Sequence, residues 1–465
     1  MVFENGKMKD VRIAYIGGGS RGWAWGLMSD LVFSDDISGE VLLYDIDREA
    51  AGRNEIIGNM HNSLPEAKSV WNYRAVDTPA EALTGADFVI VSILPGTFDE
   101  MESDVHEPEK YGIYQSVGDT TGPGGILRAM RTVPMFEEIA ENVRKYAPGA
   151  WVVNYTNPMT LCVKTLYRVF PEIKAFGCCH EVFGTQEFLS EIAKQKLGLE
   201  KKPPRDEIKI NVLGVNHFTW ITRASLRGVD LFPIYSEYCR EHPDGDPDGI
   251  DDDYDAREGC FTTAEKVKTD LFRRFGSIAA AGDRHLAEFC DGGWYLKSPE
   301  RVREMRFGLT PVRWRRADLK ERLEKSDGYL SGSLPLKLEL SGEEGVRQIR
   351  SLCGLDDIVT NVNLPNVGQI PDLPLGAVVE TNARFCSDSV TPVVAGNVPE
   401  PIFPLISRAV SQQEALNEAI AGRDLDAIFR VFENDPLVTC SASDARKLFD
   451  TMCGNTRKYL KSYGL

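Results

Sequence analysis

The fold is decided near the start of the chain, where residues 11–47 read VRIAYIGGGSRGWAWGLMSDLVFSDDISGEVLLYDID. Short, largely apolar runs at 11–16 and 41–45 predict two buried parallel strands, and the segment between them predicts a glycine turn followed by a helix. Gly17, Gly19 and Gly22 fall at the spacing G-x-G-x-x-G. In this pattern the first glycine makes the turn, the second lets the backbone approach a pyrophosphate, and the third lets the helix pack closely on the strand.

Asp45 ends the second strand, at the point where a carboxylate meets the ribose hydroxyls of a dinucleotide. The helix N-terminus after the glycines supplies free N–H groups and a positive dipole for the phosphates. We therefore expect Gly17, Gly19, Gly22 and Asp45 to bind NAD rather than NADP. A glycine turn without a ligand is the alternative, and it is less favoured because strand, helix and acid are all in place.

The composition indicates a cytoplasmic enzyme with at least two domains. A chain of 465 residues exceeds the roughly 250 to 300 residues at which a single core stops growing. The net charge of -17 argues against a nucleic-acid or membrane-surface partner, since either would need a basic face. The N-terminus is polar, and the sequence has no apolar run of about 18 residues. The ten cysteines are scattered irregularly, so we interpret them as reduced thiols.

The first 205 residues keep the alternation of strands and helices that is typical of a doubly wound parallel sheet, with further strands predicted at 86–93, 151–155 and 173–177. Two prolines within 201–205 mark a candidate boundary. Beyond it, 208–214 and 218–227 predict antiparallel strands, and helices dominate later. We expect an α/β chain: a Rossmann domain at 1–205 and a mixed α+β domain at 206–465 that completes a cleft.

An acidic segment at 244–255 partly matches an EF-hand calcium loop. The usual Glu at the twelfth position is replaced by Asp255, and Pro247 interrupts the loop. A solvated acidic insertion is therefore the preferred interpretation.

Four polar clusters lie at predicted strand ends or in loops: 118–125, 179–180, 216–217 and 282–285. Cys179, with His180 or His217, offers residue types that bind divalent transition metals, and two protein ligands leave open positions for a substrate. Taken alone, Cys179 could be a buried apolar thiol, and His217 a hydrogen-bonding core residue. Asp119 and Asp283 could likewise cap a following helix.

Together these clusters resemble glycoside hydrolase family 4, whose members are NAD- and metal-dependent glycosidases. The resemblance covers nearly the whole chain, and it implies a fold like that of lactate and malate dehydrogenases. The motifs that carry it are Ile16–Ser20, Gly118–Thr120, Gly122–Gly125, Thr156–Pro158, Cys179–Val182, Val215–His217, Gly282–His285 and Asn363–Asn366.

The resemblance also implies a mechanism. NAD takes a hydride from C3 of the sugar, a base removes the proton on C2, the glycosidic oxygen leaves by elimination, water adds, and the hydride returns. A metal, typically Mn²⁺, acts as a Lewis acid. The implied roles are Asp283 as base, Asp119 as acid, Cys179 and His217 as metal ligands, and Asn157, His180, Asn216 and Arg284 as substrate contacts.

Cys179–Val182, with the sequence CHEV, resembles the α-galacturonidase group of the family. Close alternatives are an α-glucuronidase, an α-galactosidase or an α-glucosidase. A uronide carries a carboxylate, so a local cation must compensate for the net negative charge of the protein. Arg128, Arg131 and Arg284 are candidates, although each could simply pair with a nearby acid. We also expect a homo-oligomer, a dimer or a tetramer.

Two other classes of protein, a dehydrogenase and a regulator, could share part of this pattern. An ordinary NAD-dependent dehydrogenase would share the fold, but it would need a His–Asp proton relay and no metal. A nucleotide-sensing regulator would need the glycines but not Cys179, His217, Asp119 and Asp283 together. Accumulation of NADH and titration with metal, respectively, distinguish them from the glycosidase.

Overall fold

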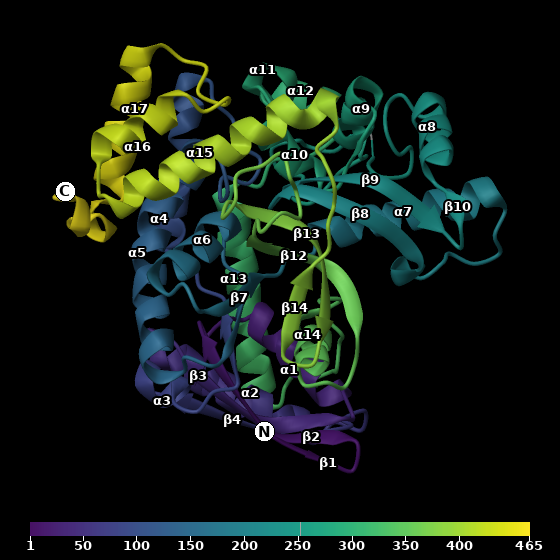
Figure 1. Cartoon of the computed structure of the whole chain (residues 1–465). Helices are drawn as coiled ribbons and strands as arrows, with labels where there is room; N and C mark the ends of the chain where they lie inside the picture. The colour runs from purple at the N-terminus through teal and green to yellow at the C-terminus, as the bar shows by residue number, and fades with distance from the viewer. Residues whose placement is uncertain (252) are drawn as a thin grey trace.

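The computed structural model describes residues 1–251 and 253–465, and Figure 1 shows two sheets surrounded by helices. The larger sheet has ten strands and the smaller one four. The larger sheet contains β1 (Val2–Glu4), β2 (Lys7–Ile16), β3 (Ile37–Tyr44), β4 (Trp71–Val76), β5 (Phe88–Val91), β6 (Trp151–Asn154), β7 (Lys174–Gly177), β12 (Ile358–Pro365), β13 (Val378–Cys386) and β14 (Ser389–Pro392). The smaller sheet contains β8 (Ile208–Val215), β9 (Phe218–Leu226), β10 (Val229–Asp230) and β11 (Ile278–Ala279).

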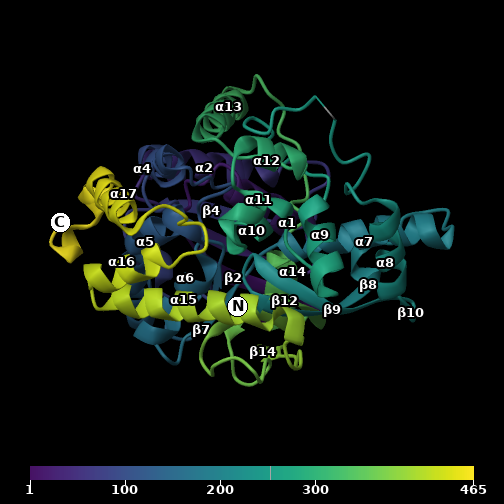
Figure 2. The same ribbon diagram turned by 90° about the horizontal axis from the view of Figure 1, so that it is seen from above.

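The helices cover both faces of the larger sheet and build the C-terminal half of the chain (Figures 1 and 2). They are α1 (Trp23–Phe33), α2 (Arg48–His61), α3 (Pro79–Leu83), α4 (Phe98–His106), α5 (Gly122–Tyr146), α6 (Met159–Val169), α7 (Glu181–Leu197), α8 (Phe232–Glu241), α9 (Lys266–Phe275), α10 (Asp283–Phe289), α11 (Gly292–Tyr295), α12 (Pro299–Glu304), α13 (Val312–Ser331), α14 (Gly345–Leu352), α15 (Phe403–Ala421), α16 (Leu425–Glu433) and α17 (Ala442–Asn455).

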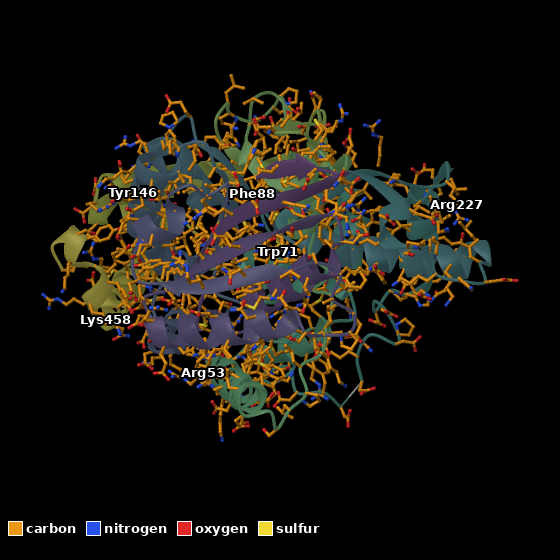
Figure 3. The ribbon with its side chains drawn as sticks, turned by 90° about the horizontal axis from the view of Figure 1, so that it is seen from below. Arg53, Trp71, Phe88, Tyr146, Arg227 and Lys458 are labelled. Atoms are coloured by element: carbon orange, nitrogen blue, oxygen red, sulfur yellow. The ribbon has the colours of Figure 1, made fainter. Side chains whose placement is uncertain are left out.

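The parallel part of the sheet has the predicted doubly wound topology. Its strands run in the spatial order β4-β3-β2-β5-β6-β7, which is the order 3-2-1-4-5-6 of dinucleotide-binding folds. Helices α1, α2 and α14 pack on one face, and α3, α5 and α6 on the other. Trp71 and Phe88 are fully buried in this sheet (Figure 3). The predicted α/β fold class is confirmed.

The C-terminal half also contributes strands to this sheet, which the sequence did not predict. β12 joins β7 antiparallel through the pair Asn363 and Gly177, and β13 and β14 continue the sheet outward. The asparagines and the glutamate on these strands hide the apolar alternation of an ordinary strand, although most of their side chains are buried. This extension brings residues 358–386 next to the predicted functional end of β7.

The glycine-dense segment 118–125 is only partly the loop that the sequence predicted, because residues 122–125 form the first turn of α5. The absence of side chains lets this turn fold tightly against the loop before it. A Cβ on Gly124 would lie 2.7 Å from the carbonyl oxygen of Gly118, and one on Gly125 would lie 2.5 Å from the carbonyl carbon of Thr120. Asp119 is thereby held just before the helix.

Helix α13 packs along α2 and α4 (Figure 2). Arg53, labelled in Figure 3, extends from α2 to this helix, donates a hydrogen bond to Ser326 at 3.2 Å and pairs with Asp327. About one turn before Ser326, Arg322 of the same helix reaches the backbone of Arg21 at the glycine turn. No helix in the described part of the chain is long and apolar enough to cross a membrane.

Candidate active site

The predicted glycine turn joins β2 to α1 and is closely packed. Gly17 has a φ of +92°, and a Cβ there would lie 2.0 Å from the carbonyl oxygen of Ser92. A Cβ on Gly19 would lie 2.7 Å from the Cβ of Ala50, so this position also excludes a side chain. The Asp45 carboxylate accepts a hydrogen bond from the Gly19 N–H at 2.8 Å. The turn and the acid thus meet at the C-terminal edge of the parallel strands, where such sheets bind ligands.

Helix α1 presents an N-terminus suited to an anion. Gly22 precedes its first turn and has no side chain that could accept hydrogen bonds from the first N–H groups. Arg322 of α13 reaches this point and donates to the carbonyl oxygen of Arg21 at 3.1 Å. A Cβ on Gly22 would lie 2.6 Å from the Arg322 Nη1 atom. Free N–H groups, a helix dipole and a nearby guanidinium fit the pyrophosphate of a dinucleotide.

Three potential metal ligands gather between the two halves of the chain. One ligand atom from each of Asp119, His217 and His285 lies within 4.8 Å of the others, and the two imidazole rings are 3.8 Å apart. His217 occupies the predicted break between β8 and β9 with a φ of +64°. A non-glycine residue in this left-handed conformation is strained, and such strain concentrates at functional sites.

The hydrogen bonds of Thr120 fix the tautomer of His217. The Thr120 hydroxyl has one proton and donates it to Asp119 at 2.6 Å, so at 2.9 Å it must accept from the His217 Nδ1–H. The lone pair of His217 is then on Nε2, the arrangement of a metal-binding imidazole. Burial lowers the pKa of His217 to about 3, which keeps the ring neutral. The His285 Nδ1 is buried and has no hydrogen-bond partner among the described residues. These features fit a divalent metal.

Cys179, the other predicted metal ligand, follows β7 and is partly buried. It is not in the group of three. Its thiol contacts Asn216, the neighbour of His217, and faces Glu380 and Glu181. Burial, followed by these two carboxylates, raises its pKa well above the usual range. A thiol in this setting needs a nearby cation to become a thiolate. The thiol of the neighbouring Cys178 has a different partner, because it donates a hydrogen bond to Gln348 at 2.7 Å.

Asp119 is held by the predicted substrate residue Asn157, whose Nδ2 donates to it at 3.3 Å. Burial acts to raise the pKa of Asp119, but the charge of Arg128, together with the two histidines and the hydrogen bond from Thr120, outweighs it and holds the pKa well below its usual range. Arg128 also donates to the backbone carbonyl of Asn157 at 3.1 Å. The Asn157 Oδ1 is buried and has no partner in the part of the chain described. It therefore remains available as an acceptor for a ligand hydroxyl.

Asp283 does not cap the helix that follows it, which was the structural alternative, but the N-terminus of α9. Its carboxylate accepts hydrogen bonds from the backbone N–H groups of Val267 and Lys268, both at 3.0 Å, and from the Thr263 hydroxyl at 3.1 Å. Burial raises its pKa to about 7. Its assignment as the base stays a prediction.

The remaining predicted substrate residues occupy different surroundings. His180 pairs with Glu343 at 2.8 Å and lies beside the ring of Trp23, the residue that follows Gly22. Asn216 is buried and donates to Glu380 at 3.2 Å. Arg284 is buried against the ring of Phe261, 4.3 Å from its centroid, and bonds to Thr310. Asn216 and Arg284 thus adjoin His217 and His285, respectively, in the chain.

The three candidate arginines, Arg128, Arg131 and Arg284, differ in whether they already have an acidic partner. Arg131 is buried and makes a bidentate ion pair with Asp104 at 3.1 and 2.5 Å, so it has a structural partner. Arg128 and Arg284 face the site, and the charge of a further arginine, Arg315 of α13, contributes to lowering the pKa of both, after burial. Arg315 has no ion pair or hydrogen bond with any other described residue. Sequence reasoning missed it because nothing in its local sequence distinguishes it from its neighbours.

Two other residues of the site were also missed. Glu181 accepts from the Gly282 N–H at 2.7 Å and lies 3.4 Å from His285 Nε2. His285 belongs to the motif Gly282–His285 but was given no role. Its position two residues after Asp283, the proposed base, was the signal that could have identified it. The acidic segment 244–255 includes residue 252, which lies outside the described residues. Asp244 pairs with Lys266 at 2.8 Å, and the preferred interpretation of the segment as an insertion stays a prediction.

Comparisons with known proteins cover the whole chain. The model described as family 4 glycosyl hydrolase matches residues 12–195, and that of the family's C-terminal domain matches 212–438. An α-galacturonidase from Thermoanaerobacterium saccharolyticum is 57% identical over 465 residues, 100% of this chain and 99% of that protein. One from Bacillus subtilis is 49% identical over 452 residues, covering 97% and 98%.

Solved structures are also similar to this chain over nearly its whole length. A structure described as glucosidase LplD from Bacillus subtilis has a TM-score of 0.89 at 50% identity, with 96% of this chain and 100% of that chain covered. A 6-phospho-β-glucosidase from Thermotoga maritima, solved with manganese, NAD⁺ and glucose-6-phosphate, has a TM-score of 0.75 at 23% identity, with 97% and 99% covered. The latter likeness concerns the fold.

Proposed function

Because the chain belongs to the family 4 glycosyl hydrolases, we propose that it hydrolyses α-galacturonides with NAD and a divalent metal, Mn²⁺, as cofactors. The observation that carries the proposal is the identity of 57% and 49% to two α-galacturonidases over nearly their full lengths. The motif at 179–182 supports the same substrate.

When bound, NAD supplies a hydride acceptor for C3 of the sugar and returns the hydride at the end of the cycle, while the metal polarises the sugar oxygens as a Lewis acid. The residues proposed to hold these groups are Gly17, Gly19, Gly22 and Asp45 for NAD and Cys179 and His217 for the metal. His285, with a ligand atom within 4.8 Å of one on His217, is available as a further ligand.

Proton transfer is proposed for the two aspartates. A pKa of about 7 suits Asp283 to remove the proton on C2 near neutral pH. Asp119 is ionised while Arg128 and its other polar neighbours hold its pKa low. A substrate carboxylate would bring a second negative charge to the same cations, which raises the pKa of Asp119 and favours its protonated form. Asp119 can then donate a proton to the leaving oxygen.

Substrate binding is proposed for Asn157, His180, Asn216 and Arg284. The uronide itself is supported by the local charge. The charge of Arg315 acts on both Arg128 and Arg284, although the whole protein has a net charge of -17. Guanidinium groups that lie close together repel one another, and they bind carboxylates well.

The test is a comparison of chromogenic α-glycosides with NAD, Mn²⁺ and a reductant present. We expect rapid cleavage of the α-galacturonide, slow or no cleavage of the α-galactoside and α-glucoside, and no accumulation of NADH. Comparable rates on galacturonide and galactoside would refute the uronide assignment. Steady release of NADH would instead indicate a net dehydrogenase.

A further inference from the structure

One buried carboxylate organises three asparagines beside the site. Glu380 of β13 is 1% exposed and accepts hydrogen bonds from the Nδ2 atoms of Asn361 at 2.7 Å, Asn363 at 3.1 Å and Asn216 at 3.2 Å. An ionised carboxylate only accepts hydrogen bonds. Each amide must therefore turn its nitrogen toward Glu380 and its Oδ1 atom elsewhere.

Two of the three Oδ1 atoms are left without a partner. Those of Asn216 and Asn363 are buried and make no hydrogen bond to any residue within 1–251 or 253–465. Buried acceptors are nearly always satisfied, because leaving one unpaired costs free energy. Asn361 differs, since its Oδ1 is not among the buried unpaired atoms and its Nδ2 also lies 3.3 Å from the Cys179 carbonyl oxygen.

The two unpaired oxygens belong to neighbouring side chains at the proposed metal site. Asn216 and Asn363 donate to the same atom of Glu380, its Oε2. Asn216 precedes His217 and contacts the thiol of Cys179. Asn363 pairs in register with Gly177, the last residue of the strand that leads to Cys179. The acceptors thus lie where the sugar must bind if Cys179 and His217 hold the metal.

We propose that Asn363 is a second substrate-binding asparagine beside Asn216, and that Glu380 is the positioning residue that aims both Oδ1 atoms at hydroxyl groups of the sugar ring. This inference rests on the proposed glycosidase function. Sugar hydroxyls are donors of the right kind, whereas the substrate carboxylate is an acceptor and is excluded from this position. The assignment gives a role to the motif Asn363–Asn366, which the catalytic scheme otherwise leaves unused.

The test compares Asn363→Ala with Asn361→Ala. Both remove one donor from Glu380 and make the same change of side chain, but only the first removes an unpaired buried oxygen. Asn363→Ala should raise KM and lower kcat/KM by about tenfold or more, since a hydrogen bond to the substrate is lost, while Asn361→Ala should change KM by less than about twofold by the same reasoning. Calorimetric affinities for Mn²⁺ and NAD should stay unchanged in both.

Glu380→Met tests the positioning role with a side chain of similar length that has no acceptor oxygen. It removes the common acceptor of Asn216 and Asn363, so nothing then holds their nitrogens away from the sugar. We expect kcat/KM to fall at least as far as in Asn363→Ala, with Mn²⁺ affinity retained.

Three outcomes would overturn the inference: equal losses in Asn361→Ala and Asn363→Ala, loss of Mn²⁺ affinity in Asn363→Ala, or full activity in Glu380→Met. The α-glycoside used is whichever one the unmodified protein cleaves fastest. Failure of the galacturonide assignment is therefore seen in the unmodified protein, separately from failure of the asparagine assignment.

Discussion

Replacing Arg315 by Gln should separate substrate specificity from catalysis. Arg315 lies on α13 and is partly buried, and its charge reaches both Arg128 and Arg284. It has no partner in the described structure, so a substrate carboxylate would be its first. A charge-assisted hydrogen bond contributes roughly 1.5 to 3 kcal/mol, which corresponds to roughly a 10- to 150-fold loss of kcat/KM on the α-galacturonide. A neutral α-galactoside should lose nothing, because it has no carboxylate.

Arg313→Gln is the matched control, since it makes the same change two residues earlier on α13, where the guanidinium already pairs with Glu258. It should leave both kcat/KM values unchanged. Removing Arg315 also relieves repulsion among three like charges, so the Tm should stay the same or rise. Steady-state kinetics on both glycosides and thermal denaturation measure these effects. Equal losses on galacturonide and galactoside, or no loss on either, would refute the assignment.

Further predictions concern the metal, the base and a buried acid. EDTA should abolish turnover, and Mn²⁺ with a reductant should restore it. Cys179→Ser should lose far more activity than Cys178→Ser. Full activity in EDTA would exclude the metal. Product formed in D₂O should carry deuterium at C2, measured by NMR, and Asp283→Ala should suppress this exchange without weakening NAD binding; unchanged exchange would exclude Asp283 as the base. Burial raises the pKa of Glu288 from 4.5 to about 7, so the native protein binds this proton more tightly than the unfolded chain does. Relative to Glu288→Gln, its Tm should fall as the pH rises from 4.5 to 7 and level off above; a difference independent of pH would contradict this.

The sequence predicted the parallel half of the fold because its signals are local. Glycine spacing, apolar strand runs and a strand-terminal acid all lie within 11–47, and the alternation of strands and helices indicates the doubly wound parallel sheet that the structure has. The pairing of β12 with β7 joins residues far apart in the chain, and no local pattern encodes it. The division at 205/206 and the dimer or tetramer stay predictions, as does the cytoplasmic location.

The site shows the same limit at the level of single side chains. In the sequence, Arg128, Arg131 and Arg284 were equivalent candidates, because each follows or adjoins a motif. Asp104 of α4 neutralises Arg131, and that choice depends on how α4 packs against α5. Arg315 enters the site only because α13 crosses over α4, with Arg316 of the same helix pairing with Asp99 on α4 at 2.8 Å. A sequence motif therefore indicates which residues lie together at the site. Which arginine can bind a substrate depends on which guanidinium group has no acidic partner once the helices have packed. By that criterion we expect Arg315, which makes no ion pair or hydrogen bond within the described residues, to bind the carboxylate of a uronide.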